Sequence, residues 1–148
     1  MQKKNGRSVV VLLRFRAWYV LAEEMINEIL MISFVRKEII GKFSDGSTSV
    51  PLKFEDKRNG EDVILMQSTG LFDKNGKEIF EGDILAVETD DETLNVNVFW
   101  DEEHALFMFE SKQYNEKEAL AELLEDYSYP FEIIGNIYEN PELLEVTK

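Results

Sequence analysis

The chain has 148 residues, a net charge of −14 and no cysteine. This length suffices for one ordinary core, and the lack of cysteine excludes disulfides and thiolate metal sites and favours a cytoplasmic location. Residues 1–60 carry 11 Lys/Arg and 7 Asp/Glu (+4), whereas residues 61–148 carry 5 and 23 (−18). Because an acidic surface repels phosphate, nucleic-acid binding by the C-terminal part is unexpected.

No targeting or membrane segment is expected. The apolar run at residues 9–13 stops at Arg14 and has no small-residue cleavage site, so it is too short for a signal peptide. No later stretch reaches the roughly 18 apolar residues that a membrane span requires.

Strands and loops are expected in the N-terminal part, residues 1–61. Residues 13–17 alternate between apolar and charged side chains, which predicts a half-buried strand that buries Phe15 and exposes Arg14 and Arg16. Residues 19–34 mix helix and strand signals, and we favour a turn followed by a strand. Residues 41–61 are rich in Gly, Ser, Asp and Asn, which is typical of loops and marks the boundary of this part.

The C-terminal part, residues 62–148, reads as a series of short strands joined by turns. Strands are expected near residues 63–67, 84–87, 94–100, 106–109 and 131–138. Asp73–Gly76 is expected to be a hairpin turn in which Asn75 and Gly76 supply positive φ angles. One helix is expected near residues 116–127, with Asn115 as its N-cap and with apolar residues at 120, 123, 124 and 127 on one face.

These elements predict a mainly β fold, a β-rich α+β protein. Short strands at intervals of roughly ten residues favour an antiparallel sandwich or a small barrel with one late helix.

The sequence contains no recognisable catalytic, metal or cofactor site. The single histidine, His104, follows Asp101 in a turn, and we interpret it as solvated because adjacent turn residues point in different directions. Asp73–Gly76 lacks the glycine spacing of a calcium loop. The basic and aromatic run with Arg14, Arg16 and Trp18 could form a binding surface that stacks on bases or holds a phosphate, although strand packing is the simpler interpretation.

Three blocks of the sequence resemble the YopX family of phage and prophage proteins. They are residues 14–18 (RFRAW), 63–84 and 133–144. The resemblance implies that residues 1–10 are an extension or follow from a misassigned start. It also implies that residues 62–148 form an SH3-like barrel, entered at residues 81–83 and closed by the strand at 133–138. It implies no activity. We regard the following residues of these blocks as structural: Gly70, Asn75, Gly76, Gly82, Asp83, Gly135 and Asn136.

Two classes of function remain open. The first is a non-enzymatic protein-interaction module, an accessory protein of a phage or prophage that binds a phage or host protein in the cytoplasm. The second is a nucleic-acid-associated module that uses the basic N-terminal part. The sequence is also compatible with a homo-oligomer.

Overall fold

The computed structural model describes residues 3–4, 7–8, 13–56, 58, 60–125 and 129–146. Its elements are the strands β1 (Lys3–Lys4), β2 (Arg7–Ser8), β3 (Phe15–Tyr19), β4 (Glu24–Ile26), β5 (Glu28–Ser33), β6 (Glu38–Lys42), β7 (Leu52–Lys53), β8 (Val63–Phe72), β9 (Glu78–Phe80), β10 (Asp83–Glu88), β11 (Thr93–Asp101), β12 (Leu106–Ser111), β13 (Glu116–Ala119) and β14 (Phe131–Asn136), the helix α1 (Glu122–Glu125) and the 3-10 helix η1 (Pro141–Leu144). The predicted mainly β class is confirmed. Among the described residues, no helix is long and apolar enough to cross a membrane.

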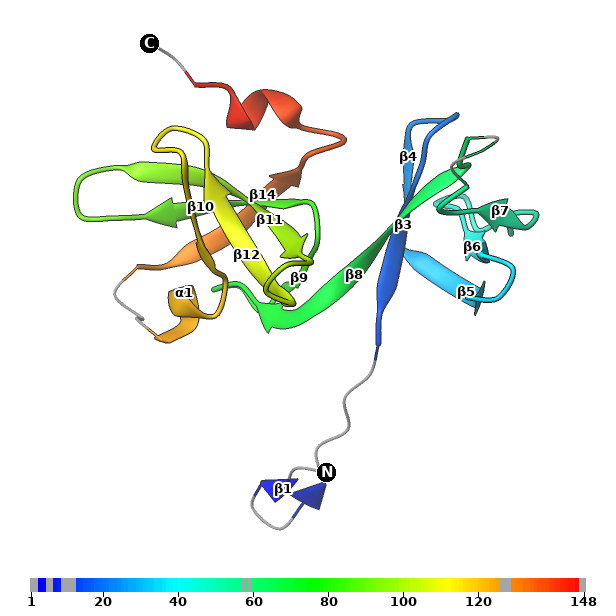
Figure 1. The fold of residues 1–148 in the computed structure, drawn as a ribbon, viewed down its shortest axis with the longest axis horizontal. Coiled ribbons are helices and arrows are strands. Elements are labelled where there is room, and N and C mark those ends of the chain that lie inside the picture. The colour runs from blue at the N-terminus through cyan, green and yellow to red at the C-terminus, as the bar shows by residue number, and fades with distance from the viewer. Residues whose placement is uncertain are drawn as a thin grey trace.

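The strands form antiparallel sheets in two parts of the molecule (Figure 1). The C-terminal part contains a curled five-stranded sheet in the order β13-β12-β11-β10-β14. The N-terminal part contains the four-stranded sheet β4-β3-β8-β9 and the three-stranded sheet β5-β6-β7. The long strand β8 connects the two parts, because its first half pairs with β3 and its second half pairs with β9. The boundary expected at residue 61 therefore falls just before a strand that both parts share.

Each part has its own hydrophobic core. The N-terminal core contains Ala17, Ile26, Ile39, Leu52, Phe54 and Val63. The C-terminal core contains Ile79, Leu85, Val87, Val96, Val98, Leu120 and Phe131. Since the two clusters are separate, the region between them must be held by other contacts.

The turn followed by a strand that we favoured for residues 19–34 is confirmed, as are the strands expected in the C-terminal part. The alternating run at residues 94–100 lies within β11, where Val96 and Val98 are buried. The extension at residues 1–10 lies largely outside the described residues.

The helix predicted near residues 116–127 is wrong over its first half. Residues 116–119 form strand β13, which pairs with β12, and α1 is a single turn that begins at Glu122. Asn115 is no N-cap but a turn residue with a φ of 53°, a conformation that asparagine tolerates well. Pairing with the open side of β12 outweighs the weak intrinsic stability of a short helix. Residues 126–127 lie outside the described residues.

The hairpin turn predicted at Asp73–Gly76 is confirmed, and it also connects two sheets. The Asp73 carboxylate accepts hydrogen bonds from the backbone N–H groups of Asn75 and Lys77 at 2.9 Å each, and from that of Ile133 in β14 at 2.9 Å. Burial raises the pKa of Asp73, but these hydrogen bonds outweigh burial and lower the pKa below its ordinary value. Gly76 has a positive φ of 78°, whereas Asn75 does not have a positive φ.

We expect Asp73→Asn to destabilise the fold by about 2 kcal/mol at neutral pH, because a hydrogen bond to a charged group contributes about 1.5–3 kcal/mol. Because the pKa of Asp73 is lowered in the folded protein, this stabilisation is fully present above pH 3.8, the ordinary pKa of the group. It is lost as the pH falls through the lower pKa of the folded state. Urea unfolding at several pH values should show a difference between the two proteins that shrinks in acid.

The control is Asp45→Asn, because the Asp45 carboxylate bonds only within its own exposed turn, to Ser47. This change should have a smaller effect. An effect of Asp73→Asn that is the same at all pH values would contradict the role assigned to its charge.

Candidate functional site

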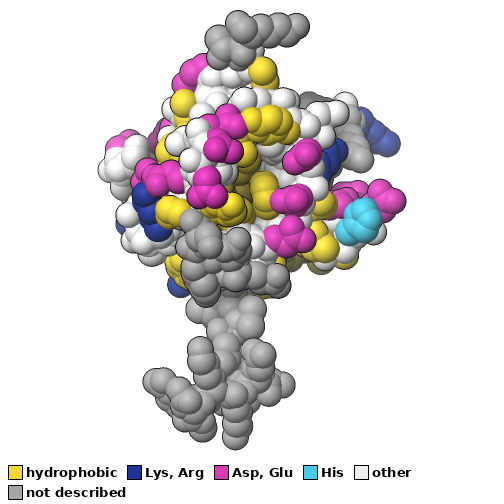
Figure 2. Space-filling model, turned by 90° about the vertical axis from the view of Figure 1, so that its left-hand side faces the viewer, with side chains coloured by type: hydrophobic (Ala, Val, Ile, Leu, Met, Phe, Trp, Pro, Cys, Tyr) yellow, Lys and Arg dark blue, Asp and Glu magenta, His cyan; other side chains and the backbone are white. Residues whose placement is uncertain are grey.

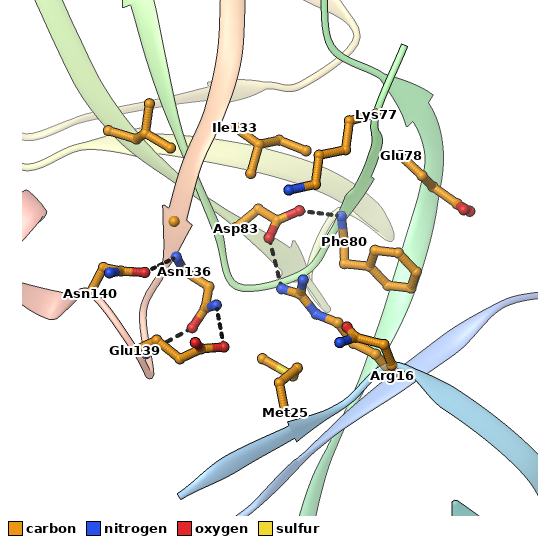
Figure 3. Close-up of a pocket in the computed structure, with 13 residues that line it drawn as sticks. Arg16, Met25, Lys77, Glu78, Phe80, Asp83, Ile133, Asn136, Glu139 and Asn140 are labelled. Carbon is orange, nitrogen blue, oxygen red and sulfur yellow. Dashed lines mark hydrogen bonds and ion pairs between the residues drawn. The ribbon is translucent and has the colours of Figure 1, made fainter. Parts of the chain in front are cut away.

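The most highly organised polar site lies between the two parts, around the buried side chain of Arg16 in β3. Its Nη2 donates to Oδ1 of Asp83 at 2.8 Å (Figure 3), and it also donates to the backbone oxygen of Glu81 at 3.1 Å. The guanidinium also lies 5.0 Å from the centre of the Phe80 ring. The exposed fractions of the paired side chains are 10% for Arg16 and 3% for Asp83, so this is a buried ion pair.

The sequence places Asp83 by way of a tight turn at the start of β10. The second carboxylate oxygen of Asp83, Oδ2, accepts a hydrogen bond from the backbone N–H of Phe80 at 2.8 Å. Burial raises the pKa of Asp83, and the opposing effect of Arg16 does not cancel that rise. The neighbouring Glu81 behaves similarly: burial raises its pKa despite a hydrogen bond from the N–H of Gln67 at 2.8 Å and the charge of Arg16.

Gly82 allows this turn. It has a φ of 87°, and a Cβ atom there would lie 3.2 Å from Sδ of Met66. Its N–H donates to the oxygen of Val98, and its own oxygen accepts from the N–H of Ile137, both at 2.8 Å. The backbone conformation therefore favours glycine, and a side chain at this position would also require Met66 to shift by a few tenths of an ångström.

The third block of the sequence closes the same site. Tyr138 stacks on the ring of Trp18, with centroids 5.5 Å apart and planes at 16°. Asn136 is buried, and its Oδ1 accepts from the N–H groups of Tyr138 at 3.0 Å and Glu139 at 2.9 Å. Oδ1 of Asn140 accepts from the N–H of Asn136 at 3.2 Å and occupies the space that a side chain on residue 135 would need, which is why Gly135 is required.

A pocket of about 560 Å³ opens beside the ion pair. Its lining combines cations, acids and amides, including Arg16, Lys77, Glu78, Asp83 and Asn136 (Figure 3). The lining residues include no serine, cysteine or histidine. The carboxylate of Asp83 is occupied by its ion pair with Arg16. The interactions observed at this site are therefore ion pairing and hydrogen bonding between the two parts of the fold.

The structure separates the three residues singled out as a binding surface. Arg14 is exposed and lies 3.7 Å from Glu78, whereas Arg16 and Trp18 are both 8% exposed. The prediction that the strand buries Phe15 and exposes its arginines is therefore wrong for Arg16, and Phe15 is only half-buried. Its face of β3 is covered by the turn at residues 81–83, a contact that strand periodicity does not reveal.

Four of the seven residues regarded as structural meet at this site, namely Gly82, Asp83, Gly135 and Asn136. The other three lie outside this site. Gly70 has a φ of 77° in β8, and Asn75 and Gly76 form the hairpin turn. Sequence reasoning missed the pairing of Arg16 with Asp83 and the stack of Trp18 on Tyr138. The signal that could have found them is that all four members lie in the three resembling blocks, with Arg16 and Trp18 in the first, Asp83 in the second and Tyr138 in the third.

The solvated turn predicted around His104 is confirmed, since its side chain is 62% exposed. The expectation that neighbouring turn residues point apart is wrong. Nδ1 of His104 lies 2.6 Å from Oδ2 of Asp101, and the candidate ligand atoms of Asp101, Glu103 and His104 lie within 4.8 Å of one another. The hydrogen bond with His104 is the main cause that lowers the pKa of Asp101.

We expect Gly82→Ala to lower the melting temperature more than Gly46→Ala does. Both glycines have positive φ angles, so both changes incur the roughly 1–2 kcal/mol cost of a left-handed L-residue. Only at Gly82 does the new Cβ also crowd a neighbour, since nothing lies within 4 Å of the Cβ position at Gly46. Thermal unfolding followed by circular dichroism measures this difference, and equal shifts would show that crowding at Gly82 is unimportant.

A double-mutant cycle should detect strong coupling between Arg16 and Asp83. Asp83→Asn alone is expected to cost about 3–5 kcal/mol, because it leaves a buried charge unpaired. Adding Arg16→Met should recover part of this loss. The exposed pair of Lys37 with Glu55, whose atoms are 3.2 Å apart, is the control and should couple by less than about 1 kcal/mol. The coupling energies are measured by urea unfolding. Similar coupling energies for the two pairs would contradict the strong coupling expected between Arg16 and Asp83.

Two proteins of known structure share this fold. A crystal structure of protein EF1440 from Enterococcus faecalis is 28% identical, with a TM-score of 0.59 over 92% of this chain and 100% of that one. The structure of protein yopX from Bacillus subtilis, 22% identical, gives a TM-score of 0.57 over 88% of this chain and 97% of that one. No curated protein matches this chain. The family model described as YopX protein matches residues 14–145, so the chain belongs to the YopX family, as the three blocks had indicated.

Proposed function

We propose that this protein is a non-enzymatic protein-interaction module that binds a basic partner through one end of its C-terminal sheet. This acidic end consists of Asp90, Asp91 and Glu92 in the loop between β10 and β11, with Tyr114 and Glu116 beside them. The hydroxyl of Tyr114 donates to the carboxylate of Glu92, which connects this loop to the turn before β13. The gathering at this end of carboxylates that, among the described residues, form no ion pair with a lysine or arginine is the observation that carries the proposal.

The electrostatics of the acidic end support attraction of cations. The pKa of Tyr114 is raised, first by its hydrogen bond to Glu92 and further by the charges of Glu92, Asp91 and Glu116. Among the ion pairs of the described residues, none joins Asp90, Asp91 or Glu92 to a lysine or arginine. Figure 2 shows acidic side chains spread over this face of the molecule around a strip of hydrophobic ones. A face of this kind attracts basic partners and disfavours acidic ones.

A protein partner fits these observations better than a nucleic acid does. The second candidate, nucleic-acid binding by the N-terminal basic run, would need Arg16 and Trp18 at the surface, and both are buried. We further propose that the protein is a phage or prophage accessory product acting in the cytoplasm on a phage or host protein. The SH3-like barrel implied for residues 62–148 is a finer description of the curled five-stranded sheet, and it stays a prediction.

Affinity capture from nuclease-treated host lysate tests this function. The wild-type protein is compared with two double variants. The test variant combines Asp90→Asn and Asp91→Asn, and the control variant, which removes the same amount of charge, combines Glu102→Gln and Glu103→Gln. The first variant should lose up to about fivefold in affinity for each charge removed, since an exposed ion pair contributes up to about 1 kcal/mol. The control should bind like the wild type. Binding should also weaken with added salt, because exposed charges are screened beyond about 8 Å.

Two results would contradict the proposal. One is equal binding by the two charge variants. The other is micromolar affinity of the wild-type protein for single-stranded oligonucleotides at physiological salt.

A further inference from the structure

Strand β5 offers an open sheet edge. It is the terminal strand of the sheet β5-β6-β7, has six residues, and has no strand on its outer side among those that the structure describes. An edge of this kind presents unpaired N–H and C=O groups that can pair with another chain. A bulge between Ile29 and Met31 turns Leu30 towards solvent, where it is 46% exposed.

The other long edges of the described sheets are protected, which distinguishes β5 from them. Strand β13 carries the charged run Glu116–Glu118, a common device against edge pairing. On β14, the N–H of Ile133 donates to the carboxylate of Asp73. The backbone oxygen of Phe131, two residues earlier, accepts from the N–H of Lys74. The remaining edge strands have two or three residues. By contrast, β5 has a single charged residue, Glu28, at its start.

Two grooves with mainly apolar linings lie beside β5. One, of about 310 Å³, is lined by Met31, Ile40 and Pro51 among others. The other, of about 670 Å³, includes Leu13, Phe15, Ile29 and Phe34. Ile32 lines both grooves. A strand added to this edge would bring its own side chains next to these apolar grooves.

We propose that the strand added to this edge is β5 of a second copy of the protein, so that two chains pair antiparallel about a twofold axis. Residues 29–32 are four consecutive apolar residues, so β5 supplies apolar side chains to both faces of the new ladder. Met31, 65% exposed, and Leu30 then become covered. Antiparallel pairing of identical strands gives the isologous contact of a twofold dimer.

Charge favours a second copy at this edge. In an antiparallel pair of β5 strands, the two Glu28 side chains lie at opposite ends, so like charges do not face each other. Residues 61–148 carry a net −18, whereas residues 1–60 carry +4. The acidic end lies at the far side of the molecule from β5 (Figure 1), so this dimer keeps the strongly acidic surfaces of the two chains apart. The surface is separate from the acidic end, and the inference does not depend on the proposed function.

Sedimentation velocity of the full chain over a range of concentrations tests the dimer. The wild-type protein should approach twice the 17.2 kDa mass of one chain as concentration rises. Met31→Lys should abolish this rise, because a lysine on an edge strand opposes pairing. The control Leu21→Lys, at a turn position that is 85% exposed, should leave the dimer intact. A wild-type chain that stays monomeric, or equal loss in both variants, overturns the proposal.

A cysteine scan locates the contact independently of stability. The chain has no cysteine, so each single variant at residues 28–33 carries one thiol. A disulfide between chains requires Cα atoms within about 7 Å of each other. Oxidation should therefore give covalent dimers that peak at one or two neighbouring positions of β5 and are absent for Leu21→Cys. A dimer in which no β5 position forms cross-links, or a monomer that instead binds an extended apolar peptide, overturns the assignment to a second copy.

Discussion

The buried pair of Arg16 and Asp83 is the constraint on which the arrangement of the two parts depends. The residues are 67 positions apart in the chain, and each loses its hydration where β3 meets the start of β10. Nη2 of Arg16 also donates to the backbone oxygen of Glu81, but its Nε is buried and has no hydrogen-bond partner among the described residues. A pair of this kind is better understood as selecting one arrangement than as adding net stability, since any other approach of β3 to this turn leaves a charge buried and unpaired.

Other contacts at the joint follow from that choice. The two hydrophobic cores are separate, so packing alone does not determine how they meet. The shared strand β8 provides a covalent and hydrogen-bonded connection, and the stack of Trp18 on Tyr138 joins β3 to the segment after β14. Asp73 then connects the β8–β9 turn to β14. Each of these contacts joins segments that are distant in sequence, so together they make the joint a cooperative unit.

Local patterns in the sequence were sufficient for most strands and turns but not for the joint. The alternation at residues 94–100 and the turn chemistry of Asp73–Gly76 act over a few residues, and both predictions are confirmed. The helix expected from Asn115 failed because the open side of β12 takes residues 116–119 as a strand. Arg16 was expected in solvent because periodicity identifies the faces of a strand but does not reveal a covering turn more than sixty residues later. The partner of a buried charge is a tertiary property.

The same joint explains how two separate surfaces can coexist on a small protein. With the parts held in one orientation, the acidic loop between β10 and β11 lies at one side of the molecule and β5 at the other (Figure 1). Repulsion between acidic ends opposes association of two copies through that face, whereas β5 carries almost no charge. The proposed basic partner and the proposed second copy would therefore not compete for one surface. If the joint were loose, the acidic part could swing towards the other copy, and this separation of charge would be lost.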